Sequence, residues 1–148
     1  MLITSHHRVK VGDFGLVRAT NAEATSDMIV GTVSYLAPEQ VTGEEITPAS
    51  DVYSAGIVLF ELLTGTVPFS GDTPLAHATA RLDSDVPAPS SRISGVPKLV
   101  DALVATATAR DPRERFADAG EFLEALDDVC RELDLPDVTI PVLSLIHI

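Results

Sequence analysis

Two short motifs and the hydroxyl side chains between them are the part of this chain best suited to chemistry. Asp13-Phe14-Gly15 is followed by Ala37-Pro38-Glu39, and the stretch that separates them ends in Gly31-Thr32. A carboxylate is a ligand for hard cations, and Ser or Thr hydroxyls can accept phosphate. Taken singly, an Asp before Phe-Gly is usually a turn residue, so the order and the separation of the two motifs matter more than either triplet.

This order of motifs resembles the activation segment of a protein kinase, which we identify with residues 13–39. The runs Tyr35-Leu36-Ala37-Pro38-Glu39-Gln40 and Glu61-Leu62-Leu63-Thr64-Gly65 are similar to bacterial transmembrane Ser/Thr kinases, particularly actinobacterial ones. The resemblance covers about residues 2–133 and implies transfer of the ATP γ-phosphate to Ser/Thr hydroxyls of protein substrates, with Mg²⁺.

The resemblance assigns roles to the first motif. Asp13 is the catalytic carboxylate that holds the Mg²⁺ bridging the ATP phosphates, and it is the one phosphate-site residue that the chain retains. Because the other parts of that site are missing, we expect ATP and Mg²⁺ to bind weakly to this chain. Phe14 packs under a helix of the N-lobe, and Gly15 allows the backbone to rotate between active and inactive arrangements.

The resemblance also assigns roles to the rest of the segment. Gly31-Thr32-Val33-Ser34-Tyr35 forms the loop that receives the substrate residue after the phosphorylated one. Within it, Thr32 contacts the catalytic Asp and marks specificity for Ser/Thr, and Tyr35 either lines the pocket or packs. The candidate activation-loop phosphosites are Thr25, Ser26 and Thr20, for which the alternative is an ordinary loop hydroxyl.

Two further assignments are architectural. By resemblance, Glu39 forms a buried ion pair with Arg115 of Asp111-Pro112-Arg113-Glu114-Arg115. Asp51 resembles a central-helix Asp that accepts hydrogen bonds from the catalytic-loop backbone. Because that loop is missing, we expect Asp51 to be a desolvated carboxylate without donors, and thus a weak point. An alternative role, compatible with the first, is a charge favoured by the helix dipole.

Several parts of a kinase are missing from the sequence. None of the nine glycines belongs to a Gly-x-Gly-x-x-Gly motif, and neither Lys10 nor Lys98 has the context of the ATP-binding lysine. We therefore expect the N-lobe, the catalytic loop and the preceding helices to be absent.

Met1-Leu2-Ile3-Thr4 resembles the run that follows the catalytic-loop Asn, so we expect Met1 to be an internal methionine, the alternative being the true start of a small protein. Residues 143–148 resemble a translated sequencing adapter, the alternative being an apolar tail.

Composition sets outer bounds on the function. The chain of 148 residues is 45% hydrophobic, with a net charge of −12, which disfavours nucleic acid as a partner. One cysteine, Cys130, fits a reducing compartment, and we expect it to pack on the apolar side of its helix. No apolar stretch is long enough to span a membrane. We expect a cytoplasmic kinase domain; similar kinases often continue into a membrane span, so a segment not present here can anchor the parent protein.

The elements that must position these residues are mainly helical. Residues 2–4 and 8–11 predict a short β-hairpin, and residues 50–63 predict a central helix that is apolar all round and stops at Gly65. Shorter helices are predicted over residues 74–81, 97–107 and 118–133, the last with an apolar face of Phe122, Leu123, Leu126, Cys130 and Leu133. Hence we expect a partial protein-kinase domain over residues 1–133, with its helical C-terminal lobe at 50–133, followed by a linker over 134–142.

Two functions of different classes follow from this organisation. The first is a fragment of a Ser/Thr protein kinase that is inactive by itself. The second is a free-standing, non-catalytic kinase-lobe module that docks substrates or partners. A lobe that lacks its neighbours should expose apolar surface and self-associate, whereas a monodisperse monomer would favour the module.

Overall fold

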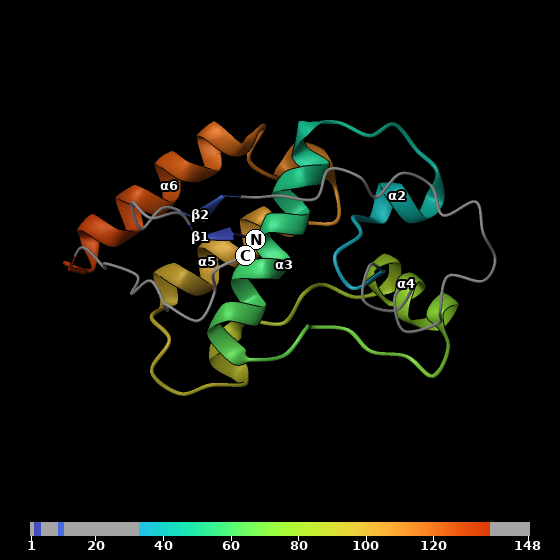
Figure 1. Cartoon of the computed structure of the whole chain (residues 1–148), viewed down its shortest axis with the longest axis horizontal. Coiled ribbons are helices and arrows are strands. Elements are labelled where there is room, and N and C mark those ends of the chain that lie inside the picture. Colours follow the sequence, from blue (N-terminus) through green and yellow to red (C-terminus); the bar gives the residue numbers. More distant parts are fainter. Residues whose placement is uncertain (1, 4–8, 11–32, 137–148) are drawn as a thin grey trace.

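The computed structural model describes residues 2–3, 9–10 and 33–136 of the chain (Figure 1). At the N-terminal side, β1 (Leu2–Ile3) pairs antiparallel with β2 (Val9–Lys10). Leu2 lies opposite Lys10, and Ile3 lies opposite Val9. The predicted hairpin is therefore confirmed at the level of its backbone pairing.

The other secondary-structure elements of the described chain are helices, joined by loops, which confirms the mainly α fold class. Its elements are α2 (Pro38–Thr42), α3 (Pro48–Thr64), α4 (Pro74–Asp83), the 3₁₀ turn η1 (Pro89–Ser91), α5 (Lys98–Ala107), the 3₁₀ turn η2 (Pro112–Glu114) and α6 (Ala119–Glu132). The sequence predicted all of the longer helices but missed the short α2, which begins inside the Ala-Pro-Glu motif.

Local signals explain where α3 begins and ends. Pro48 occupies the first turn, where its missing N–H costs nothing, and the Thr47 N–H donates to Ser50 Oγ at 3.2 Å. At the other end Gly65 adopts a left-handed φ of 79°, and its N–H donates to the Glu61 carbonyl at 2.7 Å. Glycine adopts this conformation without a steric penalty, so the predicted stop at Gly65 is confirmed.

Helix α3 is the centre of the helical body. Figure 1 shows it running through the middle of the molecule, with α5 and α6 on one side and α2 and α4 on the other. The larger apolar cluster joins α3 to α5 and α6 through Val52, Leu103, Ala107 and Phe122. The smaller cluster joins the segment before α2 to α3 through Ala37, Tyr53 and Ile57.

Three predictions of burial are wrong. Leu123 is 58% exposed and Cys130 is exposed, although the sequence placed both on the apolar face of the last helix. The face that packs is centred on Phe122, Ala125, Leu126 and Val129, so residues 123 and 130 fall at its edges. The central helix is not buried all round either, since Leu62 is 69% exposed.

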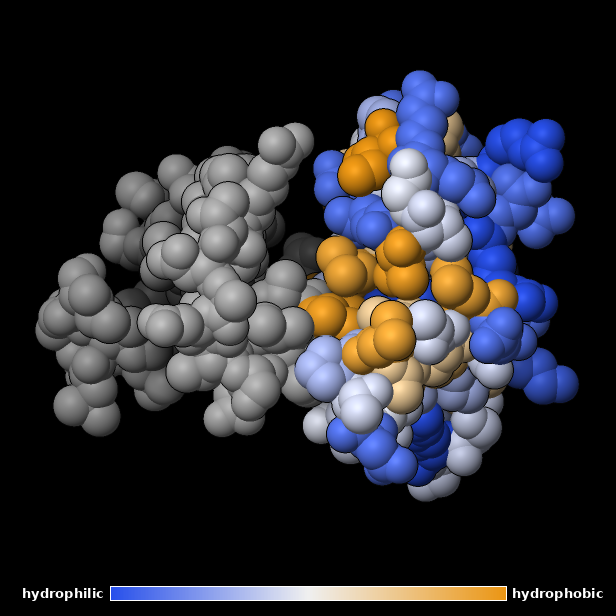
Figure 2. All heavy atoms as spheres, turned by 90° about the vertical axis from the view of Figure 1, so that its right-hand side faces the viewer, coloured by the Kyte–Doolittle hydropathy of each residue, from blue (hydrophilic) through white to orange (hydrophobic). Residues whose placement is uncertain are grey.

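Apolar side chains gather on the face formed by α2, α4 and the loops beside them. Figure 2 shows this face, with a band of hydrophobic residues across its middle and hydrophilic residues around it. Ile46, which follows α2, is 61% exposed, and Leu75 on α4 is 73% exposed. None of the helices in the described ranges combines the length and the apolar character that crossing a membrane requires.

Candidate functional site

The structure describes only part of the predicted site. Asp13, Phe14, Gly15, Thr20, Thr25, Ser26, Gly31 and Thr32 lie outside the described residues. Tyr35, Glu39, Asp51 and Arg115 lie inside them. Because Asp13 lies outside the described residues, its role stays a prediction. Among the described residues no group of three or more His, Cys, Asp or Glu side chains could hold a metal ion.

Glu39 and Arg115 form the ion pair that the sequence predicted. Arg115 Nη1 donates to Glu39 Oε2 at 2.7 Å, and Arg115 Nη2 donates to Glu39 Oε1 at 2.9 Å. The Arg115 side chain is 0% exposed and the Glu39 side chain is 2% exposed. This two-pronged geometry is the strongest form of a carboxylate–guanidinium contact, and it connects the Ala37-Pro38-Glu39 motif to the loop before α6.

The remaining donors of Arg115 are also used. They reach the carbonyl oxygens of Ala49 at 3.1 Å, Ala109 at 2.6 Å and Arg110 at 3.1 Å. The guanidinium also lies 4.9 Å from the centroid of the buried Tyr53 ring. Arg115 therefore connects α2, the start of α3 and the segment after α5, and each connection helps to offset the cost of burying its charge.

Ser50 completes the contacts of Glu39. Its hydroxyl donates to Glu39 Oε2 at 2.7 Å, which joins the first turn of α3 to the same carboxylate. Burial by itself raises the pKa of Glu39, but the hydrogen bonds from Arg115 and Ser50 outweigh it and hold that pKa below its ordinary value. Glu39 is therefore a carboxylate at neutral pH.

Tyr35 belongs to a turn of residues 33–36 that helix α3 holds from one side. Ser54 Oγ donates to the Tyr35 carbonyl at 2.7 Å, and the Tyr35 hydroxyl donates to Glu61 Oε2 at 2.7 Å. That hydrogen bond, with burial and the charge of Glu61, raises the pKa of Tyr35 to about 12. Of the two roles left open for Tyr35, packing is visible, because it lies against the Ala37–Tyr53–Ile57 cluster.

Helix α4 holds the same turn from the other side, through residues that the sequence did not single out. His77 Nε2 lies 3.1 Å from Ser34 Oγ, and Arg81 Nη1 donates to the carbonyl oxygens of Ser34 and Leu36. Both α4 side chains are buried. The one signal in the sequence is their spacing of four residues, which places them on the same face of a helix.

Asp51 differs from its predicted state. It is exposed and lies in the first turn of α3, so the expectation of a desolvated carboxylate is wrong for this chain. Its position fits the alternative role, since an acidic side chain near a helix N-terminus is favoured by the dipole.

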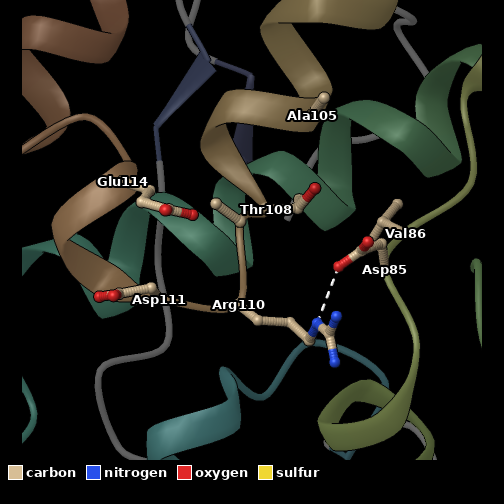
Figure 3. A pocket seen from close by; sticks show the side chains of 8 residues that line it. Asp85, Val86, Ala105, Thr108, Arg110, Asp111 and Glu114 are labelled. Atoms are coloured by element: carbon tan, nitrogen blue, oxygen red, sulfur yellow. Dashed lines mark hydrogen bonds and ion pairs between the residues drawn. The ribbon is translucent and has the colours of Figure 1, made fainter.

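A cavity of about 490 Å³ lies away from the predicted site residues. It is lined by residues of the segment after α4, the end of α5 and η2 (Figure 3). Arg110 extends across it toward Asp85, and the ion pair measures 2.8 Å between Arg110 Nε and Asp85 Oδ1. Both partners are largely exposed, so this pair contributes little to stability. The cavity is open and lacks a convergent set of buried polar groups, which argues against a catalytic centre there.

Comparison with known proteins identifies the family. The model of the protein kinase domain matches residues 1–126. Serine/threonine-protein kinase PknL of Mycobacterium tuberculosis (strain CDC 1551 / Oshkosh) is 48% identical over 143 residues, which are 95% of this chain and 36% of PknL. The probable serine/threonine-protein kinase PknB of Bifidobacterium longum is 43% identical over 126 residues, which are 82% of this chain and 18% of that protein. The chain thus spans about a third or less of the length of these relatives.

A solved structure supports the fold. The twitchin kinase region from C. elegans superposes with a TM-score of 0.57 and 24% sequence identity, over 66% of this chain and 17% of that chain. At this level of identity the likeness concerns the fold alone. It agrees with a helical body that resembles the C-terminal lobe of a kinase.

Proposed function

The chain belongs to the protein kinase family, and on this premise we propose that it is the C-terminal-lobe part of a bacterial Ser/Thr protein kinase. The parent protein transfers the γ-phosphate of ATP to Ser or Thr hydroxyls of proteins. The observation that carries the proposal is the Glu39–Arg115 pair, because it anchors the end of the predicted activation segment to the helical body. The loop that we propose to receive the substrate, Gly31 to Tyr35, precedes this anchor, and its residues 33–35 lie in the described turn of residues 33–36.

The proposed reaction needs parts that this sequence does not contain. A substrate hydroxyl oxygen attacks the γ-phosphorus, the bond to the bridging β–γ oxygen breaks, and ADP leaves. The hydroxyl proton passes to the Asp of a His-Arg-Asp catalytic loop, and no such motif occurs in the sequence. When bound, Mg²⁺ neutralises the charge of the phosphates, and Asp13 is its proposed ligand.

The described residues contribute position rather than proton transfer in this proposal. The turn of residues 33–36 is held by Ser54 and Glu61 of α3 and by two side chains of α4. A surface held from two helices can present a fixed shape to an extended peptide, which is how a kinase gains rate from orientation. We therefore assign to this chain the binding and orientation of protein substrates.

A phosphorylation assay tests this function. The purified 148-residue chain, incubated with radiolabelled ATP, Mg²⁺ and a Ser/Thr peptide, should transfer no phosphate. The kinase domain completed from the genomic locus should transfer it, and Asp13→Asn should lower kcat by about 100-fold or more. Labelling by the isolated chain would overturn its proposed inactivity, and a completed domain without activity would overturn the kinase function.

The exposed apolar surface favours self-association over a free-standing docking module. Ile46, Leu62 and Leu75 are each more than half exposed, and Figure 2 shows apolar side chains gathered on the face that carries α4. We propose that the isolated chain associates with itself through such surfaces. Sedimentation velocity should show oligomers that dissociate on dilution, whereas a monomer at all concentrations would favour the non-catalytic module.

A further inference from the structure

Two buried side chains of α4 converge on the turn of residues 33–36. Arg81 is 0% exposed and His77 is 5% exposed, although Leu75, the second residue of α4, is 73% exposed. The pair is separated by four residues, so both project from one face of the helix toward the turn. Together they contact Ser34 and Leu36, which are more than 40 positions earlier in the chain.

Arg81 is held by carbonyl oxygens alone within the described part of the chain. Its Nη1 donates to the carbonyls of Ser34 and Leu36, its Nη2 to that of His77 at 3.2 Å, and its Nε to that of Ala78 at 2.9 Å. No carboxylate of residues 33–136 forms an ion pair with it. A buried guanidinium without a counter-charge is costly, and the four hydrogen bonds to carbonyl oxygens help to offset that cost. The turn must therefore keep its shape if the Arg81 guanidinium is to keep its hydrogen bonds to the Ser34 and Leu36 carbonyls.

The surroundings fix α4 against this turn. The Arg81 guanidinium lies 5.7 Å from the centroid of the Phe69 ring, which covers it from the loop before the helix. A Cβ atom built on Gly71 would lie 2.5 Å from the backbone nitrogen of His77. The loop before α4 therefore packs directly on the helix backbone, and α4 cannot shift without moving Phe69 and Gly71.

We propose that His77 and Arg81 are positioning residues, which hold residues 33–36 in the shape that receives the substrate. The inference rests on the proposed kinase function and adds a second helix to the control of substrate placement. Arg81 fixes the backbone of the turn through the Ser34 and Leu36 carbonyls, and His77 fixes the Ser34 side chain. Neither residue contacts the reacting atoms in this proposal, so its loss should impair peptide binding more than the chemical step.

Hydrogen exchange of the 148-residue chain tests the placement without any activity. In Arg81→Met the amides of residues 33–42 should exchange at least about tenfold faster, the equivalent of one charge-assisted hydrogen bond, whereas α5 and α6 keep their protection. Arg81→Lys should show a similar effect, because a single ammonium cannot replace the planar fork. Arg131→Lys on the exposed face of α6 is the matched control and should change nothing. Unchanged exchange of residues 33–42 in both Arg81 variants would overturn the proposal.

Variants of His77 provide a second test if the Arg81 variants fail to fold. His77→Gln retains an amide near the position of Nε2 and should preserve slow exchange at residues 33–36, whereas His77→Leu should accelerate it. Equal exchange in the wild-type chain and in His77→Leu would contradict a role in holding the turn. This comparison also separates a specific hydrogen bond from simple packing, since leucine fills a similar volume.

Peptide kinetics of the completed kinase domain test the functional half. Arg81→Lys should raise the KM for peptide about tenfold and leave kcat and the KM for ATP within about twofold, and Arg131→Lys should leave all three unchanged. A fall in kcat and a rise in the KM for ATP as large as the rise in the KM for peptide would overturn the positioning role. A completed wild-type domain without activity would refute the proposed function itself, while the exchange experiment would still decide whether α4 holds the turn.

Discussion

The two sides of helix α3 are held together by different kinds of interaction. On the α5 and α6 side, contact is apolar, through Val52, Leu103 and Phe122 and the partly buried side chains around them. On the α2 and α4 side, the contacts that cross between elements are buried charges and hydrogen bonds, centred on Arg115 and Arg81. The apolar cluster on that side is small.

The difference has a physical consequence for function. Apolar packing tolerates exchanges of similar volume, because it has no directional requirement. A buried polar network accepts only partners in a fixed geometry, since each unmatched donor or charge costs its desolvation energy. The α2 and α4 side of α3 is the polar side, and the α5 and α6 side is the apolar side. The turn of residues 33–36, which we propose to orient the substrate, lies on the polar side, where the buried contacts allow the fewest alternative geometries.

The largest effect should come from breaking the polar side at Arg115. Arg115→Met removes the ion-pair partner of Glu39 and leaves a buried carboxylate with the Ser50 hydroxyl and the Glu39 backbone N–H as donors but no counter-charge. We expect a loss of about 3–5 kcal/mol in the free energy of unfolding, measured by urea denaturation followed by far-UV circular dichroism.

An exposed arginine in the same loop provides the control. Arg113 pairs with Asp111, but its side chain is 90% exposed, so Arg113→Met should leave the unfolding free energy nearly unchanged. Adding Glu39→Gln to Arg115→Met should cost little more, since the carboxylate has already lost its partner. Equal losses in the Arg113 and Arg115 variants would contradict the assignment of Arg115 as the centre of this side.

The next largest effect should come from the apolar side. Phe122 is 6% exposed, and its ring centroid lies 5.3 Å from that of Phe116. Phe122→Ala removes its ring from the α3–α5–α6 cluster and should cost about 3 kcal/mol, measured in the same urea titration. The neighbouring Leu123 is 58% exposed, so Leu123→Ala should cost less than about 0.5 kcal/mol. A larger loss for Leu123 than for Phe122 would mean that α6 packs by its other face.

The same contrast explains how far the sequence could predict the molecule. Helix ends follow local rules, so Gly65 and Pro74 marked the end of α3 and the start of α4 correctly. The Glu39–Arg115 contact joins positions 76 apart, and no local periodicity indicates it. It was predictable only because both motifs resemble those of a known family.

The errors have equally particular causes. Arg81 lies in the last turn of α4, where a cation is normally solvated and favoured by the dipole. Nothing near it in the sequence indicates that its donors turn inward to carbonyls of residues 34 and 36. Cys130 fits an apolar stripe by spacing, but the face of α6 that packs against the core includes Val129, and the cysteine lies exposed beside it. In both cases tertiary contacts outweigh the local pattern.

A smaller effect should test how closely the apolar side is packed. A Cβ atom on Gly56 would lie 2.6 Å from Thr108 Cγ2 and 3.0 Å from Ala107 Cβ, where α3 crosses the end of α5. Gly56→Ala gains up to about 1 kcal/mol of helix propensity but should lose more by overpacking, for a net destabilisation of about 1–2 kcal/mol. Gly120→Ala, whose new Cβ would meet only Asp118 Oδ1 at 3.3 Å, should be neutral or stabilising. A stabilised Gly56→Ala in thermal denaturation would show that the two helices can separate without loss.

The smallest effect concerns pH and returns to the polar side. Because the folded pKa of Glu39 lies below its ordinary value of 4.5, its contribution to stability is present above that value and is lost as pH falls toward the folded pKa. Between pH 7 and pH 5 this group should change the unfolding free energy by less than about 0.5 kcal/mol. The difference in unfolding free energy between the wild-type chain and Glu39→Gln should therefore stay constant above pH 5 and narrow below pH 4.5.

Glu124→Gln, at an exposed position of α6, controls for the removal of one negative charge. A difference that remains constant down to pH 3 would mean that Glu39 does not draw its stability from its charge, and the polar side would then depend on the carbonyl contacts of Arg115 and Arg81 alone.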